Sequence, residues 1–121
     1  MQLEELYGII GGDFENAKAI MTREERIEKY LKLFLKEESF GVLKKAFEED
    51  NMEEAFKACH TLKGICANMS FTKLETLSKQ ITEDLRHMEN VEDAKATFPK
   101  LREQYDLIIT NINKYFEEKG N

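Results

Sequence analysis

The spacing of the apolar residues is the feature that most constrains the fold of this chain, because these residues recur at alternating steps of four and three. That spacing places them on one face of an α-helix, whereas a half-buried strand would need strict alternation of apolar and polar residues. The longest example lies near the C-terminus and includes Pro99. The spacing leaves open whether this helix begins at the proline or bends there. Its apolar members are Ala94, Phe98, Leu101, Tyr105, Ile108, Ile112 and Tyr115.

Shorter runs with the same spacing predict six helices before this last one. The connections between them are only a few residues long, which favours contact between consecutive helices. We therefore predict an all-α fold, an antiparallel up-down four-helix bundle at about residues 39–118. Short additional N-terminal helices would occupy residues 1–38, and residues 1–121 would form a single domain. The six shorter predicted helices cover residues 1–10, 13–21, 22–37, 39–50, 51–70 and 70–88.

Capping residues mark the starts of several predicted helices. Thr22 with Glu25, and Asn51 with Glu54, have the spacing of capping boxes, in which two side chains satisfy free backbone N–H groups. Ser70 is expected to cap the helix that follows it. The apolar residues expected to face inward from the second and third helices are Phe14, Ala17 and Ile20, then Ile27, Tyr30, Leu31, Phe34 and Leu35.

The charge balance argues against several classes of partner. The chain has 24 acidic and 18 basic residues, a formal net charge of −6, whereas nucleic-acid binding needs a concentrated basic face. No apolar run approaches the length of a membrane span, and the N-terminus lacks the blocks of a signal peptide. We therefore expect a cytoplasmic monomer with no nucleic-acid or membrane partner. Terminal helices that look complete favour a free-standing protein.

Two cysteines lie in one predicted helix. Cys59 and Cys66 belong to its apolar stripe and are separated by about 10 Å along the axis, which is too far for a disulfide. We interpret them as small buried apolar residues. A metal site made from Cys59, His60, Cys66 and His87 is the sharper alternative, but no ligand spacing supports it. We expect this chain to hold no metal and no cofactor of its own.

The predicted helix at residues 51–70 carries one histidine away from its apolar stripe. At about 100° per residue, His60 lies roughly 125° from the mean direction of the stripe. Lys57 and Gly64 fall on the same side as His60, while Lys63 and Ala67 lie at the border between that side and the core. The stripe itself consists of Ala55, Cys59, Leu62, Cys66 and Met69.

The neighbours of this histidine suit a reaction with an anionic group. Glycine inside a helix costs roughly 1 kcal/mol relative to alanine, so Gly64 needs a reason, and room for a bulky partner beside His60 is one. Lys63 carries a flexible positive charge that can reach an anion held on the histidine. An exposed imidazole is partly unprotonated at neutral pH and can act as a nucleophile.

The run from Ala58 to Met69 resembles the signature of histidine-containing phosphotransfer (Hpt) domains, in which a His-x-x-Lys-Gly run lies on one helix of a four-helix bundle. The resemblance implies that His60 is the phosphoacceptor, Lys63 stabilises the phosphoryl group and Gly64 provides steric clearance. Many members also carry a glutamine on the following helix, at the position of Thr82 here, where a threonine hydroxyl would substitute in part.

The resemblance also implies the partners. A receiver domain would pass a phosphoryl group from its aspartate to His60, and another would take it onward, with Mg²⁺ held by the receiver. Lys57, Ala67 and Thr82 would contact that partner, and a hybrid histidine kinase is a further expected partner. The chain has no glycine-rich nucleotide loop, so we do not expect it to be a kinase or other enzyme. The alternatives are a bundle that docks partners through the same face without phosphotransfer, and a metal-binding bundle.

Overall fold

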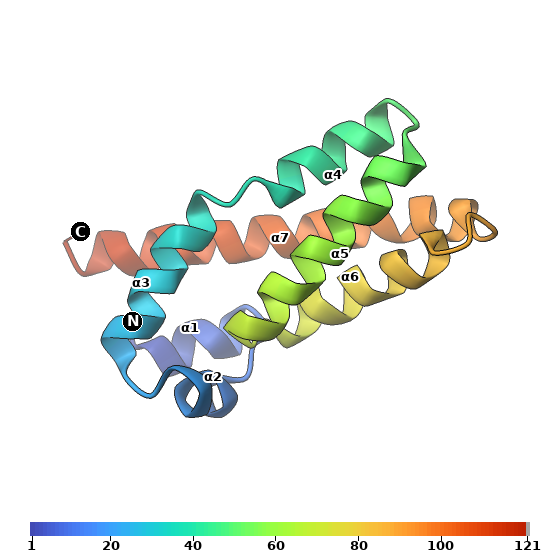
Figure 1. The fold of residues 1–121 in the computed structure, drawn as a ribbon. Coiled ribbons are helices and arrows are strands. Elements are labelled where there is room, and N and C mark those ends of the chain that lie inside the picture. The colour runs from blue at the N-terminus through green and yellow to red at the C-terminus, as the bar shows by residue number, and fades with distance from the viewer. Residues whose placement is uncertain (121) are drawn as a thin grey trace.

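The computed structural model describes residues 1–120, so that Asn121, the last residue of the predicted domain, lies outside the described residues. These residues form seven helices and no strand, which confirms the all-α prediction (Figure 1). The helices are α1 (Leu3–Ile9), α2 (Phe14–Met21), α3 (Glu24–Leu35), α4 (Ser39–Glu48), α5 (Met52–Met69), α6 (Thr72–Leu85) and α7 (Val91–Glu118).

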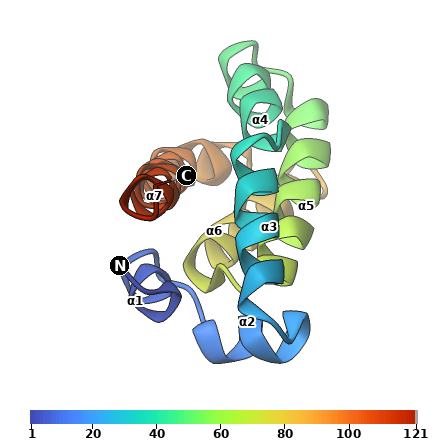
Figure 2. The same cartoon turned by 90° about the vertical axis from the view of Figure 1, so that its left-hand side faces the viewer.

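The last four helices are packed in chain order. Helix α4 contacts α5, α5 contacts α6, and α6 contacts α7. Aromatic rings then join α4 back to α7, because Phe40 stacks on Tyr105 with ring centroids 4.0 Å apart and Phe47 stacks on Phe98 at 4.6 Å. Helices α1 and α2 lie together at one end of this group, beside the C-terminal end of α5 (Figures 1 and 2).

Helix α7 resolves the alternative that the spacing around Pro99 left open. It begins at Val91 and continues through the proline to Glu118, so the helix does not start at Pro99. The proline ring is exposed, where the missing backbone N–H is not surrounded by the core.

The predicted caps are right at one position and wrong at two. The Asn51 side chain accepts a hydrogen bond from the Glu54 N–H at 3.2 Å, which is one half of the predicted capping box, whereas the Asn51 N–H donates to the Ala46 carbonyl at 2.7 Å. Helix α3 instead has Arg23 at its N-cap, because Thr22 adopts a positive φ of 65° and its hydroxyl donates to the Met21 carbonyl. Ser70 does not cap α6 but ends α5 in the left-handed conformation.

The core lies along most positions of the predicted stripes, and Met88 at the end of the α6 stripe is 43% exposed. All five stripe residues of α5 are buried, as are most inward positions of α6 and α7. Ile20 and Tyr30, which were expected to face inward, are 52% and 41% exposed. Within the described part of the chain, no helix is long and apolar enough to cross a membrane.

The short N-terminal helices hold the C-terminal end of α5. The buried Tyr7 hydroxyl donates to the Met69 carbonyl at 2.9 Å, and the Asp13 N–H donates to the Ser70 carbonyl at 2.9 Å. Gly12 permits this close approach, because a Cβ there would lie 2.6 Å from the Tyr7 ring and 3.0 Å from the Ser70 oxygen. These contacts use backbone carbonyls that the helix end leaves without an internal partner.

A polar cluster joins α3 to the end of α7. The Glu28 carboxylate accepts a hydrogen bond from the Tyr115 hydroxyl at 2.7 Å and another from the Lys119 ammonium. Burial alone would raise the pKa of Glu28, but these two hydrogen bonds and the nearby charges of Lys119 and Lys32 bring the pKa below its usual value. The cluster therefore favours the ionised carboxylate in the folded protein.

Candidate functional site

His60 is exposed on the outer face of α5, on the side opposite the buried stripe. Gly64, one turn further along the helix, is also exposed, and a Cβ built on it would meet no described atom within 4 Å. The packing of this chain therefore does not require a glycine at position 64. An alanine at this position would fit and would favour the helix, so the packing of the described residues gives no reason for the glycine.

Two lysines border this histidine. Lys57 is exposed, and its ammonium lies 3.9 Å from the Glu54 carboxylate in a loose surface pair. Lys63 is half-buried on the side of α5 that faces α6, and its charge contributes to lowering the pKa of Glu83 on α6. Ala67, beyond Gly64 on the helix, is half-buried, and its small side chain projects little from the helix surface.

An aromatic ring lies beside the histidine ring. The Phe56 ring, one turn before His60, stacks on the imidazole with centroids 6.2 Å apart and planes 20° apart. The Arg86 guanidinium, from the end of α6, lies 5.6 Å from the centroid of the same Phe56 ring. The Phe56 ring therefore lies near both His60 on its own helix and Arg86 at the end of α6.

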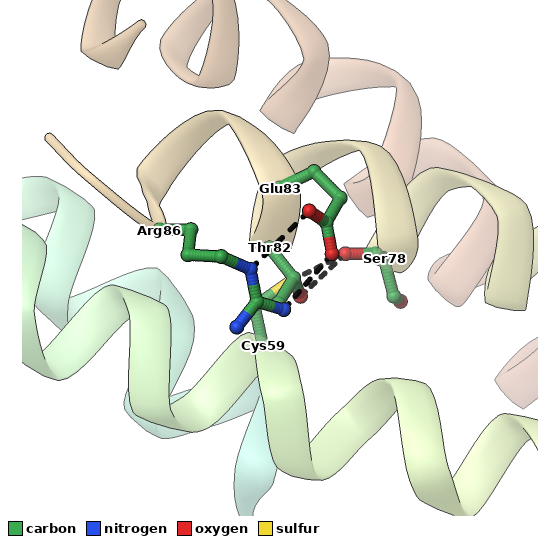
Figure 3. A network of polar contacts seen from close by, with 5 residues as sticks. All are labelled: Cys59, Ser78, Thr82, Glu83 and Arg86. Carbon is green, nitrogen blue, oxygen red and sulfur yellow. Dashed lines mark hydrogen bonds and ion pairs between the residues drawn. The ribbon is translucent and has the colours of Figure 1, made fainter. Parts of the chain in front are cut away.

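Arg86 is paired with a carboxylate on its own helix. Its Nη2 donates to Glu83 Oε1 at 2.9 Å and its Nε donates to Oε2 at 3.2 Å, so the pair is bidentate (Figure 3). These hydrogen bonds, more than any other contact, lower the pKa of Glu83. The predicted site did not include Phe56, Glu83 or Arg86. Spacing in the sequence shows only which residues share a face of one helix, so it does not show that Arg86 lies near Phe56 on another helix.

The prediction that Thr82 contacts the partner is wrong. Its side chain is fully buried between α5 and α6, and its hydroxyl donates to the Ser78 carbonyl at 2.7 Å. The thiol of Cys59 on α5 donates to the same carbonyl at 3.2 Å (Figure 3). A threonine is too short to reach the outer surface from this position, so its hydroxyl is satisfied inside its own helix.

The cysteines are buried and free, as the stripe predicted. Burial raises the pKa of the Cys59 thiol to about 11 and also raises the pKa of Cys66. Both thiols are therefore inert at neutral pH. The side chains of the metal-site alternative point to different places, since His60 and His87 are exposed, and residues 1–120 contain no group of His, Cys, Asp or Glu placed to hold a metal.

A partly apolar groove continues from the histidine face toward the N-terminal helices. Asn68, one turn beyond Gly64, forms one side of it together with Ile65. The exposed side chains of Ile20 and Tyr30 lie on the other side. Two residues that were expected to face inward, Ile20 and Tyr30, therefore line this groove instead.

Comparison with known protein families identifies one match. The model of the Hpt domain family matches residues 25–111 of the 121-residue chain. The match includes all of α3 except Glu24, the whole of α4 to α6 with His60 and its neighbours, and most of α7. Comparison with curated proteins and with solved structures finds no match. The family match indicates a role in histidine phosphotransfer within a phosphorelay.

Proposed function

We propose, from the fact that the chain belongs to the Hpt domain family, that it is a phosphorelay intermediate whose phosphoacceptor is His60. In this proposal a receiver-domain aspartyl phosphate donates the phosphoryl group, and a second receiver domain accepts it. The observation that carries the proposal is the exposed imidazole of His60 beside Gly64, where a Cβ would meet no described atom. That combination serves an incoming protein surface and has no use in the packing of this chain.

The chemical step needs little from the chain beyond position and charge. The lone pair of the unprotonated ring nitrogen attacks phosphorus and forms the P–N bond. The bond between phosphorus and the aspartate oxygen breaks, and the leaving carboxylate keeps its electron pair. Lys63, half-buried beside His60, would stabilise the transferred oxygens. We assign Mg²⁺ to the receiver, and we propose no cofactor and no kinase activity for this chain.

The partner surface would extend from His60 over Gly64 and Ala67. The exposed Lys57 supplies a positive charge that complements the acidic surroundings of a phosphorylated aspartate. The apolar groove lined by Ile20, Tyr30, Ile65 and Asn68 adjoins this surface and offers apolar area to the same partner.

The remaining parts of the proposal concern the setting of the site. We propose that α4 to α7 form an antiparallel four-helix bundle, supported by the contacts between consecutive helices and by the aromatic rings between α4 and α7. We further propose a cytoplasmic monomer that serves receiver domains, with a hybrid histidine kinase as the upstream source of the phosphoryl group.

The test is phosphotransfer from a phosphorylated receiver domain in Mg²⁺. We expect acid-labile phosphate on the wild-type chain and none on His60→Gln, while His87→Gln, which changes the other exposed histidine, accepts phosphate normally. Both variants should unfold at the wild-type temperature, because both side chains are exposed. A stable complex with receivers but no phosphohistidine would indicate an interaction module instead. Phosphate on His60→Gln would refute the assignment of the acceptor.

A further inference from the structure

The Glu83 carboxylate on α6 is paired with Arg86, and the charges of Lys63 and Lys79 also act on it. Glu83 holds Arg86 through two hydrogen bonds, and the charge of Lys63 acts on the same carboxylate. The guanidinium of Arg86 is therefore paired with a carboxylate in this structure. The pairing is not enclosed, because the side chains of Arg86 and Glu83 are 40% and 52% exposed.

The position of Arg86 relative to the histidine is defined by Phe56. The Arg86 guanidinium lies 5.6 Å from the centroid of the Phe56 ring, and the centroid of the His60 imidazole lies 6.2 Å from the same point. On the wheel of α5, Phe56 and Lys63 both fall on the α6 side of His60. A phosphoryl group on the imidazole would therefore have Lys63 on its own helix and Arg86 at the end of the neighbouring helix α6.

We propose that Arg86 is a second phosphoryl-binding residue, held on Glu83 until His60 is phosphorylated and then transferred to the phosphoryl oxygens. The inference rests on the proposed function of His60. Arg86 runs from the end of α6 back to Glu83, so the exchange requires only rotation of an exposed side chain (Figure 3). It exchanges a single carboxylate for a group of nearly two negative charges and three acceptor oxygens.

The exchange is favourable because the two pairings differ in strength. An exposed pair three residues apart on one helix stabilises little, since water screens it and two side chains lose freedom. The planar guanidinium can instead donate two parallel hydrogen bonds to a phosphoryl group with higher charge. Glu83 then acts as a positioning residue: it keeps Arg86 near His60, and it competes with the phosphoryl group for the guanidinium.

A test on the isolated chain avoids any effect of partner docking. The full chain is phosphorylated with phosphoramidate, and the proton affinity of the phosphoryl group is followed by ³¹P NMR as the pH is varied. A guanidinium on the oxygens favours the dianion and lowers that affinity. We expect Arg86→Gln to raise the affinity about threefold and Glu83→Gln to lower it about threefold, as for one exposed charge-assisted contact. Arg86→Lys should restore part of the effect.

Matched variants separate this contact from general charge. Arg102→Gln and Glu103→Gln make the same charge changes at exposed positions of α7 and should leave the titration unchanged. Glu83→Gln should have a smaller effect when Arg86→Gln is also present, because its main action is through the arginine. Equal titration of Arg86→Gln and Arg102→Gln, or an undiminished effect of Glu83→Gln in the double variant, would overturn the inference. Failure of wild type to gain phosphate on His60 would instead refute the proposed function.

Discussion

Replacing Gly64 with alanine should stabilise the isolated protein while it weakens phosphotransfer. The added Cβ would meet no described atom within 4 Å, so the substitution introduces no clash inside the chain. Alanine is favoured over glycine in a helix interior by about 1 kcal/mol, and for a domain of this size that corresponds to a rise of about 4 °C in melting temperature. Thermal unfolding followed by circular dichroism measures this gain.

Phosphotransfer should change in the opposite direction. In the proposed complex the partner packs against α5 at Gly64, where no side chain projects from the helix. A methyl group inserted into a packed contact costs about 1–3 kcal/mol. A cost near the middle of this range slows transfer by more than tenfold, and Gly64→Gln should slow it further. Rapid-quench measurement of transfer from a phosphorylated receiver provides the rate.

A second helical glycine provides the control. Gly41 lies in α4, is exposed, and likewise has no described atom within 4 Å of a built Cβ. Gly41→Ala should raise the melting temperature, less than Gly64→Ala because it lies in the first turn, and should leave transfer unchanged. If Gly64→Ala and Gly64→Gln both transfer phosphate at the wild-type rate, the clearance argument fails.

Three other predictions concern stability and thiol chemistry. Tyr7→Phe should lower the free energy of unfolding in urea by about 1–2 kcal/mol, because the Met69 carbonyl loses its buried donor. The Glu28 carboxylate, with a lowered folded pKa, contributes stability above its usual value of 4.5, and this is lost as the pH falls through the folded value. The difference in unfolding free energy between wild type and Glu28→Gln should therefore narrow below pH 4.5. Cys59, with its pKa raised to about 11 by burial, should react with iodoacetamide at pH 8 only after unfolding, as mass spectrometry would detect.

The spacing of apolar residues correctly predicted the features that depend on a single helix, such as which of its sides faces the core. The stripe of α5 determined which side faces the core, and therefore that His60 and Gly64 face outward. The caps were less predictable, since Thr22 and Ser70 have suitable side chains but adopt positive φ angles at turns. Short polar residues favour helix starts and left-handed turns alike, so residue type does not distinguish these two uses.

Contacts between helices could not be derived in this way. Thr82 occupies the position expected for a partner contact, but the rotation of α6 against α5 turns it into the core. The same rotation brings Arg86 over Phe56, a contact between residues 30 positions apart in the chain. Spacing within a helix defines the angle between two side chains, whereas the rotation of one helix against another depends on the packing of both.

Helices α1 and α2, which precede the region matched by the family model, make contacts with the helix that carries His60. Residues 25–111 contain the whole of α5, but the C-terminal end of that helix is closed by the Tyr7 hydroxyl and the Asp13 N–H, which lie before the matched residues. Ile20 of α2 also lines the apolar groove beside the histidine face. Loss of α1 and α2 would therefore expose backbone carbonyls at the end of the helix that carries His60 and remove one wall of the proposed partner surface. The segment before the matched region thus closes the end of the helix that carries His60, and it would supply part of the proposed partner surface.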